Sequence, residues 1–404
     1  MKKLLCVFIP ALLLLSTVSF SAFANYGEEA DDGIPPESAS GSFYNYDWSY
    51  DSETKTITFS DNGSPKLEPP VEIPDFSGYG EYESMEKTYE WNPEYPWFEN
   101  PKYAVYAEKA VFDSSVKEIM NYHLRKFYNL TSLEMAPSVK TIGSDAFQYC
   151  RKLKDIEYNG TLEETWCNIF YGTAFQNDKS NWDGNYLYFG NALIIFDRGG
   201  TGTSSPFSVK DGTVTVADAA CEFLGYDSLV LPDSVRFIGE RAFLCSKFRN
   251  ITLSSNLERI GEEAFCCCRY LEEITLPESL KHIENGAFSE CVGLSVLKLP
   301  AGVEAIGTDE SIVKSCYNIK AVEVDGNNKN FCSVNGVVFS RDKTEIVVYP
   351  EAKEDEYYEI PSGVKTVYPD FCNVKSLRGV SITNKVPRIA NELSPIKRYF
   401  YMGT

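Results

Sequence analysis

The chain has 404 residues, and its 58 acidic and 38 basic side chains give a formal net charge of −20 at pH 7. Such an acidic exterior repels the phosphates of DNA and RNA, so the composition excludes nucleic acid as a partner. It disfavours an anionic membrane surface for the same reason. The length leaves room for about two or three domains.

Residues 1–24 have the pattern of a secretory signal peptide. Lys2 and Lys3 precede an apolar run, and Ala22-Phe23-Ala24 forms a small-residue cleavage site. We expect cleavage after Ala24 and an exported protein that is secreted or associated with the cell surface. The sequence predicts no membrane span, because no later apolar run reaches about 18 residues.

Two segments of different character follow. Residues 25–41 are acidic and rich in Pro, Ser and Gly, which predicts a flexible lead-in. Residues 42–101 are predicted to form an N-terminal β-rich and irregular cap, and the alternating pattern of residues 43–63 indicates a hairpin. The stretch 64–101 is rich in Pro, Tyr and Trp. Its aromatic rings either pack against the first repeat or offer a surface for stacking on sugars.

Four stretches further along are copies of one another. They begin at Val139 (VKTIGSDAFQYCRKLKDIEY), Val235 (VRFIGERAFLCSKFRNITL), Leu257 (LERIGEEAFCCCRYLEEITL) and Leu280 (LKHIENGAFSECVGLSVLKL). They share the frame V/L-x-x-I-G-x-x-A-F, then a cysteine, then x-x-L-x-x-I-x-L. A repeat frame with this many filled positions predicts a solenoid.

The pattern within one copy predicts its conformation. Ile274 and Leu276 alternate with Glu273 and Thr275, as expected for a half-buried strand. The A-F part is predicted as a short helix or turn with its apolar side chains inward, and Gly261 permits tight backbone there. One copy cannot bury its apolar face alone, so stacked copies share one core. The predicted fold is a repeat solenoid, with a parallel β-sheet on one face and short helices or turns on the other.

The repeat frame resembles the BspA-type (Treponema pallidum-type) leucine-rich repeats over about residues 105–389. The resemblance implies a leucine-rich-repeat superhelix and a secreted or surface bacterial protein used for binding and adhesion. We therefore predict a solenoid over residues 102–392, with insertions at about 159–212 and 325–359, and a tail over 393–404. Hairpins are predicted within the insertions, at residues 186–196 and 331–350.

The chain shows no recognisable catalytic constellation. Its two histidines, His123 and His282, have no metal-ligand partner at useful spacing, and no Ser or Cys has an identifiable base. The Asx-rich turn at residues 177–185 hints at calcium but fails the EF-hand pattern, because Lys179 occupies the first ligand position. We therefore predict no enzyme, no catalytic residue, no metal and no cofactor. The abundant carboxylates leave a glycosidase pair open.

The strand face offers a candidate partner-binding surface. In each repeat the residues between the buried apolar positions point outward, and solenoids bind partners on such extended faces. The predicted function is non-enzymatic binding or adhesion to a protein or glycan through this face. The alternative is a polysaccharide-acting enzyme or accessory with its site in residues 64–101 or 158–210. The candidate residues are Glu134, Asp155, Glu157, Val230, Asn250, Thr252, Glu273, Thr275, Val296, Lys298, Glu323 and Ser381.

The run Cys266-Cys267-Cys268 is interpreted through the repeat. A cysteine stands three residues before the next apolar position in five copies, which predicts a buried column where thiols act as small hydrophobes. Cys266 and Cys267 are expected in outer, variable positions. Whether column cysteines form disulfides stays open. The predicted column contains Cys150, Cys245, Cys268, Cys291 and Cys316.

Overall fold

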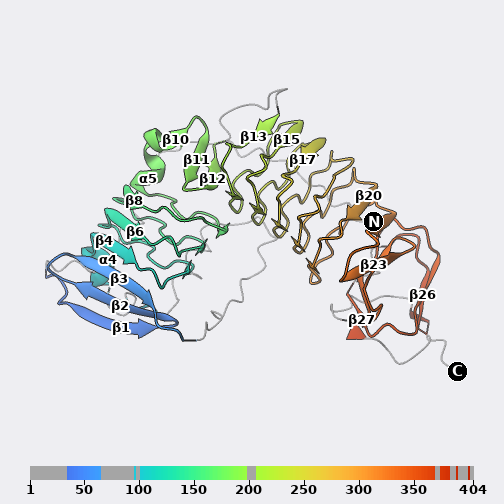
Figure 1. Cartoon of the computed structure of the whole chain (residues 1–404), viewed down its shortest axis with the longest axis horizontal. Helices are drawn as coiled ribbons and strands as arrows, with labels where there is room; N and C mark the ends of the chain where they lie inside the picture. Colours follow the sequence, from blue (N-terminus) through green and yellow to red (C-terminus); the bar gives the residue numbers. More distant parts are fainter. Residues whose placement is uncertain are drawn as a thin grey trace, which may run out of the picture.

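The computed structural model describes residues 34–64, 95–96, 101–197, 206–368, 374–382, 388–389 and 399–400. These residues wind into stacked coils that form a curved solenoid, with an N-terminal cap at one end and the C-terminal coils at the other (Figure 1). The predicted repeat solenoid is therefore confirmed. The predicted signal peptide, most of the lead-in and most of the stretch 64–101 lie outside the described residues.

An antiparallel β-meander caps the N-terminal end of the solenoid. It consists of β1 (Ala39–Phe43), β2 (Tyr46–Asp51) and β3 (Thr56–Asp61), which confirms the predicted hairpin and begins inside the predicted lead-in. Ile57 and Phe59 of β3 are fully buried. The helix α4 (Lys102–Tyr106) leads into the first coil, where β3 pairs in parallel with β4 (Lys109–Phe112). The cap thus supplies hydrogen bonds to a sheet edge that would otherwise be open.

Each coil contributes to a first row of parallel strands, whose labelled members follow the outer edge of the curve in Figure 1. Residues 273–276 fall in this row without pairing as a strand, although Ile274 and Leu276 are buried as predicted. After β4, the row contains β6 (Ser132–Met135), β8 (Asp155–Glu157), β13 (Phe207–Ser208), β15 (Ser228–Val230), β17 (Asn250–Thr252), β20 (Val296–Leu299), β22 (Ala321–Val324), β26 (Tyr357–Ile360), β28 (Gly379–Ile382) and β30 (Tyr399–Phe400).

A second row of parallel strands runs along another side of the coils, and the alternation pattern did not predict it. Most of its strands have two residues and end on the isoleucine of the I-G frame, so they are too short to show alternation. The row contains β5 (Glu118–Ile119), β7 (Thr141–Ile142), β9 (Glu164–Thr165), β12 (Ala192–Phe196), β14 (Thr215–Val216), β16 (Phe237–Ile238), β18 (Arg259–Ile260), β19 (His282–Ile283), β21 (Ala305–Ile306), β25 (Glu345–Val348), β27 (Thr366–Val367) and β29 (Arg388–Ile389).

The A-F segments form turns that are joined by a third hydrogen-bonded ladder. The N–H group of Phe243 donates to the carbonyl oxygen of Ala264 in the next coil at 2.9 Å, and that of Cys245 donates to Cys266 at 2.8 Å. Cys245 has a left-handed φ of 56°, and Cys267 in the next coil has 60°. Such angles are uncommon outside glycine. Their recurrence from coil to coil shows that the ladder, rather than any one residue, imposes them.

Two hairpins interrupt the coils, as predicted. β10 (Trp182–Asp183) and β11 (Tyr186–Phe189) extend β12, and β23 (Phe331–Val334) and β24 (Val337–Ser340) extend β25. The prediction that an insertion begins at about 159 is wrong, because residues 162–173 make a regular coil. In that coil β9 pairs with β7. Thr165 and Trp166 replace the I-G pair there, which hides the repeat. The short helices α5 (Ala174–Asn177) and η1 (Lys179–Asn181) then lead to the hairpin.

Columns of like side chains fill the core. The rings of Phe243 and Phe265 stack with centroids 5.4 Å apart, and those of Phe265 and Phe288 with centroids 5.7 Å apart. Gly261 meets the preceding coil so closely that a Cβ atom would lie 2.6 Å from the carbonyl carbon of Gly239. A side chain at Gly261 would therefore push these two coils apart, because two backbone segments meet there without room for a Cβ atom.

The cysteine column is confirmed at four positions and wrong at one. Ser246, 1% exposed, holds the place predicted for Cys245, because the one-residue deletion in this repeat falls after the column position. Cys245 instead aligns with Cys267. Cys266 is 7% exposed, so the expectation of an outer position is wrong for its side chain. The fully buried column members are Cys150, Cys268, Cys291 and Cys316.

Candidate functional site

The outward side chains of the first row form a surface that we call the first-row face. Parallel pairing places equivalent residues side by side in neighbouring coils: Val230 lies beside Thr252, and Lys298 beside Glu323. Glu134 and Ser381 are half-buried, and the other ten predicted residues are exposed. Their outward direction follows from the period-two alternation of a strand. Their role in binding stays a prediction.

The structure brings the predicted residues together in groups rather than in one unbroken row. Glu134, Asp155 and Glu157 share the sheet that contains the cap. The hairpin β11–β12 separates this group from Val230, Asn250 and Thr252, and the second hairpin lies between Glu323 and Ser381 along the chain. Ser381 lies beside Glu359 in the C-terminal sheet. A partner that contacts both ends must therefore span the length of the solenoid.

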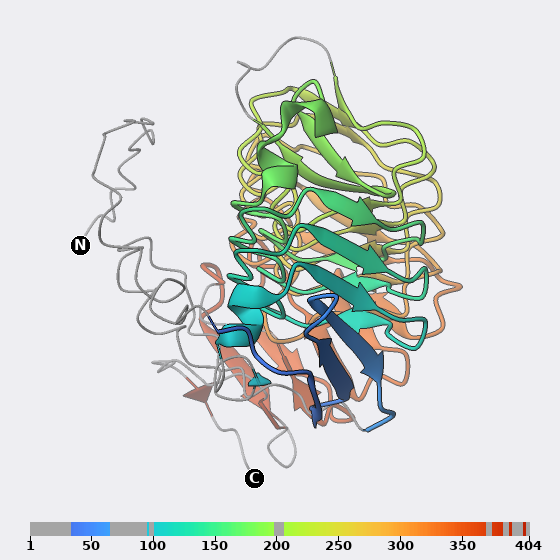
Figure 2. The same cartoon turned by 90° about the vertical axis from the view of Figure 1, so that its left-hand side faces the viewer.

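The cap extends the first-row face, which the repeat alignment could not show. β3 continues the same sheet through its parallel pairing with β4 (Figure 2). In β2 every second residue is exposed, so its polar side chains lie on the outer side of the sheet. A shallow hollow there is lined by Ser40, Gly41, Ser42, Asp47, Trp48, Ser49, Thr58 and Ser60. Alternation within residues 43–63 predicted the hairpin, but only the β3–β4 pairing adds it to this face.

The first-row face is acidic. Its lysines are held by neighbouring carboxylates: Lys298 lies 3.6 Å from Glu323, and Lys109 forms an ion pair with Glu134. Glu157 and Glu273 add exposed negative charge. Exposed pairs of this kind contribute little to stability. Carboxylates outnumber ammonium groups among the predicted residues of the face, which gives it a negative field.

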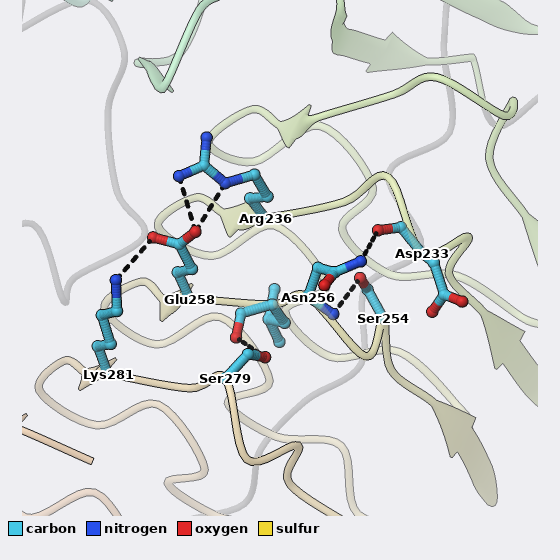
Figure 3. Close-up of polar contacts among 8 residues, drawn as sticks. Asp233, Arg236, Ser254, Asn256, Glu258, Ser279 and Lys281 are labelled. Atoms are coloured by element: carbon cyan, nitrogen blue, oxygen red, sulfur yellow. Dashed lines mark hydrogen bonds and ion pairs between the residues drawn. The ribbon is translucent and has the colours of Figure 1, made fainter. Parts of the chain in front are cut away.

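Polar side chains beside the second row also bind one another across the coils (Figure 3). Glu258 accepts from Arg236 at 2.7 Å and lies 3.3 Å from the Lys281 ammonium. Burial alone would raise the pKa of Glu258, but hydrogen bonds from Arg236 and Lys281 outweigh it and lower that pKa. Asn256 donates to the carbonyl oxygen of Asp233 at 2.9 Å. These groups hold neighbouring coils together.

Neither histidine lies in surroundings typical of a metal site. His123 is fully buried among aromatic rings of the cap and first coils, with centroids 4.7 Å from Phe59 and 4.9 Å from Tyr46. Burial lowers the pKa of His123 to about 3, so the ring is neutral at physiological pH. His282 is half-buried on β19. In the described ranges no group of three or more His, Cys, Asp or Glu side chains is placed to hold a metal ion.

A membrane-crossing helix would need a long apolar run. Within the part of the chain that the structure describes, no helix is long and apolar enough to cross a membrane. The described helices α4, α5 and η1 have 5, 4 and 3 residues.

Comparison with solved structures gives distant matches. The pneumococcal vaccine antigen PcpA is 26% identical, with a TM-score of 0.41 over 50% of this chain and 63% of that chain. A leucine-rich repeat protein from Eubacterium ventriosum is 17% identical, with a TM-score of 0.28 over 85% and 60%. A leucine rich cell surface protein from Faecalibacterium prausnitzii is 17% identical, with a TM-score of 0.31 over 73% and 96%. The chain spans less than two thirds of the first two proteins.

Comparison with protein families identifies the repeat. The BspA type leucine rich repeat region matches in 6 copies, over residues 103–181 and 215–343. No curated protein matches the chain. The matched residues make up about half of the sequence and lie on both sides of the first hairpin insertion. The chain belongs to the BspA-type leucine-rich repeat family.

Proposed function

We propose that this chain is an exported, non-enzymatic binding protein of a bacterial cell surface, and that its partner is a protein with a basic surface. The observation that carries this proposal is the regular register of exposed side chains on the first-row face. Solenoids use such extended faces for recognition. Export rests on the predicted signal peptide, and a binding role is what the family implies.

The exposed carboxylates of the first-row face support its choice as the binding surface. In the second row, Arg236, Glu258 and Lys281 already satisfy one another. A partner would have to break these contacts before it could form its own. On the first-row face Glu157 and Glu273 are exposed and available.

The chemistry of the face favours a protein over a glycan. Val230 and Val296 are 38% and 37% exposed on the same face as the carboxylates of Glu157 and Glu273, a mixture that suits a protein surface with basic and apolar groups. Sugar binding would be expected to use several exposed aromatic rings. Among the exposed large hydrophobic side chains on the described part of this face, only Tyr357 is aromatic, at 69% exposure. Glycan binding and polysaccharide hydrolysis are therefore the alternative outcomes of the test.

The test begins with a screen of the purified chain on arrays of extracellular proteins and of glycans. The dissociation constant of a protein that binds is then measured for two double variants. Glu157→Lys with Glu273→Lys changes the first-row face. Glu163→Lys with Glu304→Lys changes exposed residues next to the second row by the same total charge.

We expect the face variant to weaken binding at least about tenfold, which corresponds to about 1.4 kcal/mol. The matched variant is expected to change it by less than about twofold, because it alters only the long-range field. Equal weakening by both variants would show that net charge rather than this face decides binding. Hydrolysis of a polysaccharide by the purified chain would replace the proposal with the enzyme alternative.

A further inference from the structure

Three thiols meet on the turn side of two neighbouring coils. The Cys266 thiol donates to Sγ of Cys267 at 3.7 Å. Cys245, from the preceding coil, stands beside Cys267, and each of these two thiols shifts the pKa of the other. All three are free thiols in the structure. The repeat alignment missed this cluster because it assigned Cys245 to the buried column.

Cys245 and Cys267 hold the same position in successive coils. Both have left-handed backbone, and the turn ladder joins their segments through the 2.8 Å hydrogen bond from Cys245 N–H to the Cys266 carbonyl oxygen. Hydrogen-bonded neighbouring chains lie about 4.8 Å apart. A disulfide needs a Cα separation of about 4.4 to 6.8 Å. The ladder therefore sets a spacing at which these two residues can be bridged without unwinding a coil.

The surroundings of Cys267 favour its thiolate. Hydrogen bonds from Cys245 and Cys266 lower the pKa of the Cys267 thiol, and the Arg269 guanidinium acts in the same direction. Arg269 is itself fixed by Glu290 at 2.6 Å. Cys245 and Cys267 are partly exposed, so a small reagent can reach them. In the neighbouring column, burial raises the pKa of the Cys268 thiol to about 12.

We propose that Cys245 and Cys267 form a thiol–disulfide exchange site that accepts a small-molecule disulfide and closes a cross-coil disulfide bond. The Cys267 thiolate attacks one sulfur of the reagent, whose S–S bond breaks and releases one thiolate. Cys245 then attacks Sγ of Cys267 in the mixed disulfide and releases the second. The small disulfide is reduced to two thiols, which take up the two protons that the cysteines lose.

The product is a covalent bond between two coils that backbone hydrogen bonds and the Arg241–Glu263 ion pair join on this side. Cys266 adjoins Cys267 in sequence, and a bond between these two would join no coils. Cys245 and Cys267 are about one repeat apart in the chain, so their bond closes a loop of about 22 residues and restricts the unfolded chain. The site is separate from the first-row face, and its existence does not depend on the proposed binding function.

The test uses the purified full chain, reduced and then exposed to oxidised glutathione under native conditions. Trypsin cuts after Arg241, Lys247, Arg259 and Arg269, so AFLCSK contains Cys245 and IGEEAFCCCR contains the other thiols. We expect mass spectrometry to find these two peptides joined, and the link to disappear after treatment with dithiothreitol. Absence of the link in the native protein, or a disulfide within IGEEAFCCCR alone, would overturn the proposal.

Single variants assign the two steps. Cys245→Ser should stop the reaction at a glutathione adduct on Cys267, whereas Cys267→Ser should give neither adduct nor link. Cys266→Ser should still form the link. Each variant is first compared with the unchanged chain by circular dichroism, so that a folding defect is recognised. A link that persists in Cys267→Ser would assign the bond to another thiol and contradict the proposed pair.

Discussion

The Cys291 thiol donates to the carbonyl oxygen of Phe265 in the preceding coil at 3.1 Å. Cys316 makes the same contact with Phe288 at 3.0 Å, and Cys268 with Phe243 at 3.4 Å. The Ser246 hydroxyl group donates an equivalent hydrogen bond to the carbonyl oxygen of Cys221 at 3.5 Å. The column position therefore calls for a small side chain that fills space and donates one hydrogen bond. Cysteine and serine meet both needs.

Replacement of Cys268 by alanine should lower the free energy of unfolding by about 1 to 2 kcal/mol, because it removes a buried sulfur and leaves a small cavity. Cys266→Ser should cost less, since serine replaces the sulfur by an oxygen and leaves no cavity of the size that alanine leaves. Chemical denaturation under reducing conditions measures both. Equal losses at the two positions would contradict the assignment of Cys268, and not Cys266, to the buried column.

Gly261→Ala should destabilise the solenoid by about 1 to 3 kcal/mol, because overpacking forces the backbone to move. A Cβ atom at Gly261 would lie 2.6 Å from the Gly239 carbonyl carbon, whereas one at Gly363 would meet nothing within 4 Å. Gly363→Ala is therefore the matched control and should be close to neutral. Thermal unfolding of the two variants gives the comparison. A neutral result at Gly261 would mean that the coils can separate at little cost.

Stability should fall in acid because of His123. Its pKa is lowered from 6.5 in an unfolded chain to about 3 by burial, so only the unfolded state binds the proton between these values. This loss of folding stability is absent above pH 6.5 and grows as the pH falls toward 3, by about 1.4 kcal/mol per pH unit. His123→Phe should flatten this part of the pH profile of unfolding. An unchanged acid slope in a folded variant would exclude the histidine as its source.

Asp145 should act in the opposite direction. Burial raises its pKa from 3.8 to about 6, against the favourable charge of Arg125. The folded state therefore holds the proton more tightly, and stability is lost as the pH rises from about 4 to 6, by at most about 1.4 kcal/mol per unit. Asp145→Asn keeps an acceptor for Gln148 and removes the titration. We expect the free energy of unfolding of the variant to rise relative to that of the unchanged chain as the pH increases over this interval. Urea denaturation at several pH values measures this difference.

The sequence by itself determined the repeat and the burial of its side chains. Ile274 and Leu276 are inward, the column thiol of Cys268 is buried, and hairpins lie at both predicted insertions. Side-chain periodicity reports burial directly, because an apolar residue recurs wherever the chain faces the core. The outward direction of residues such as Glu157 follows from the same pattern.

Only the tertiary structure decided which backbone groups pair and which coils touch. The second strand row uses two-residue strands, the turn ladder uses left-handed residues such as Cys267, and the cap joins the first-row face through β3 and β4. None of these leaves a pattern in side-chain polarity, because the hydrogen bonds are made by the backbone. For the same reason the contact between Cys245 and Cys267 became visible only when the coils were stacked: it depends on where a one-residue deletion falls.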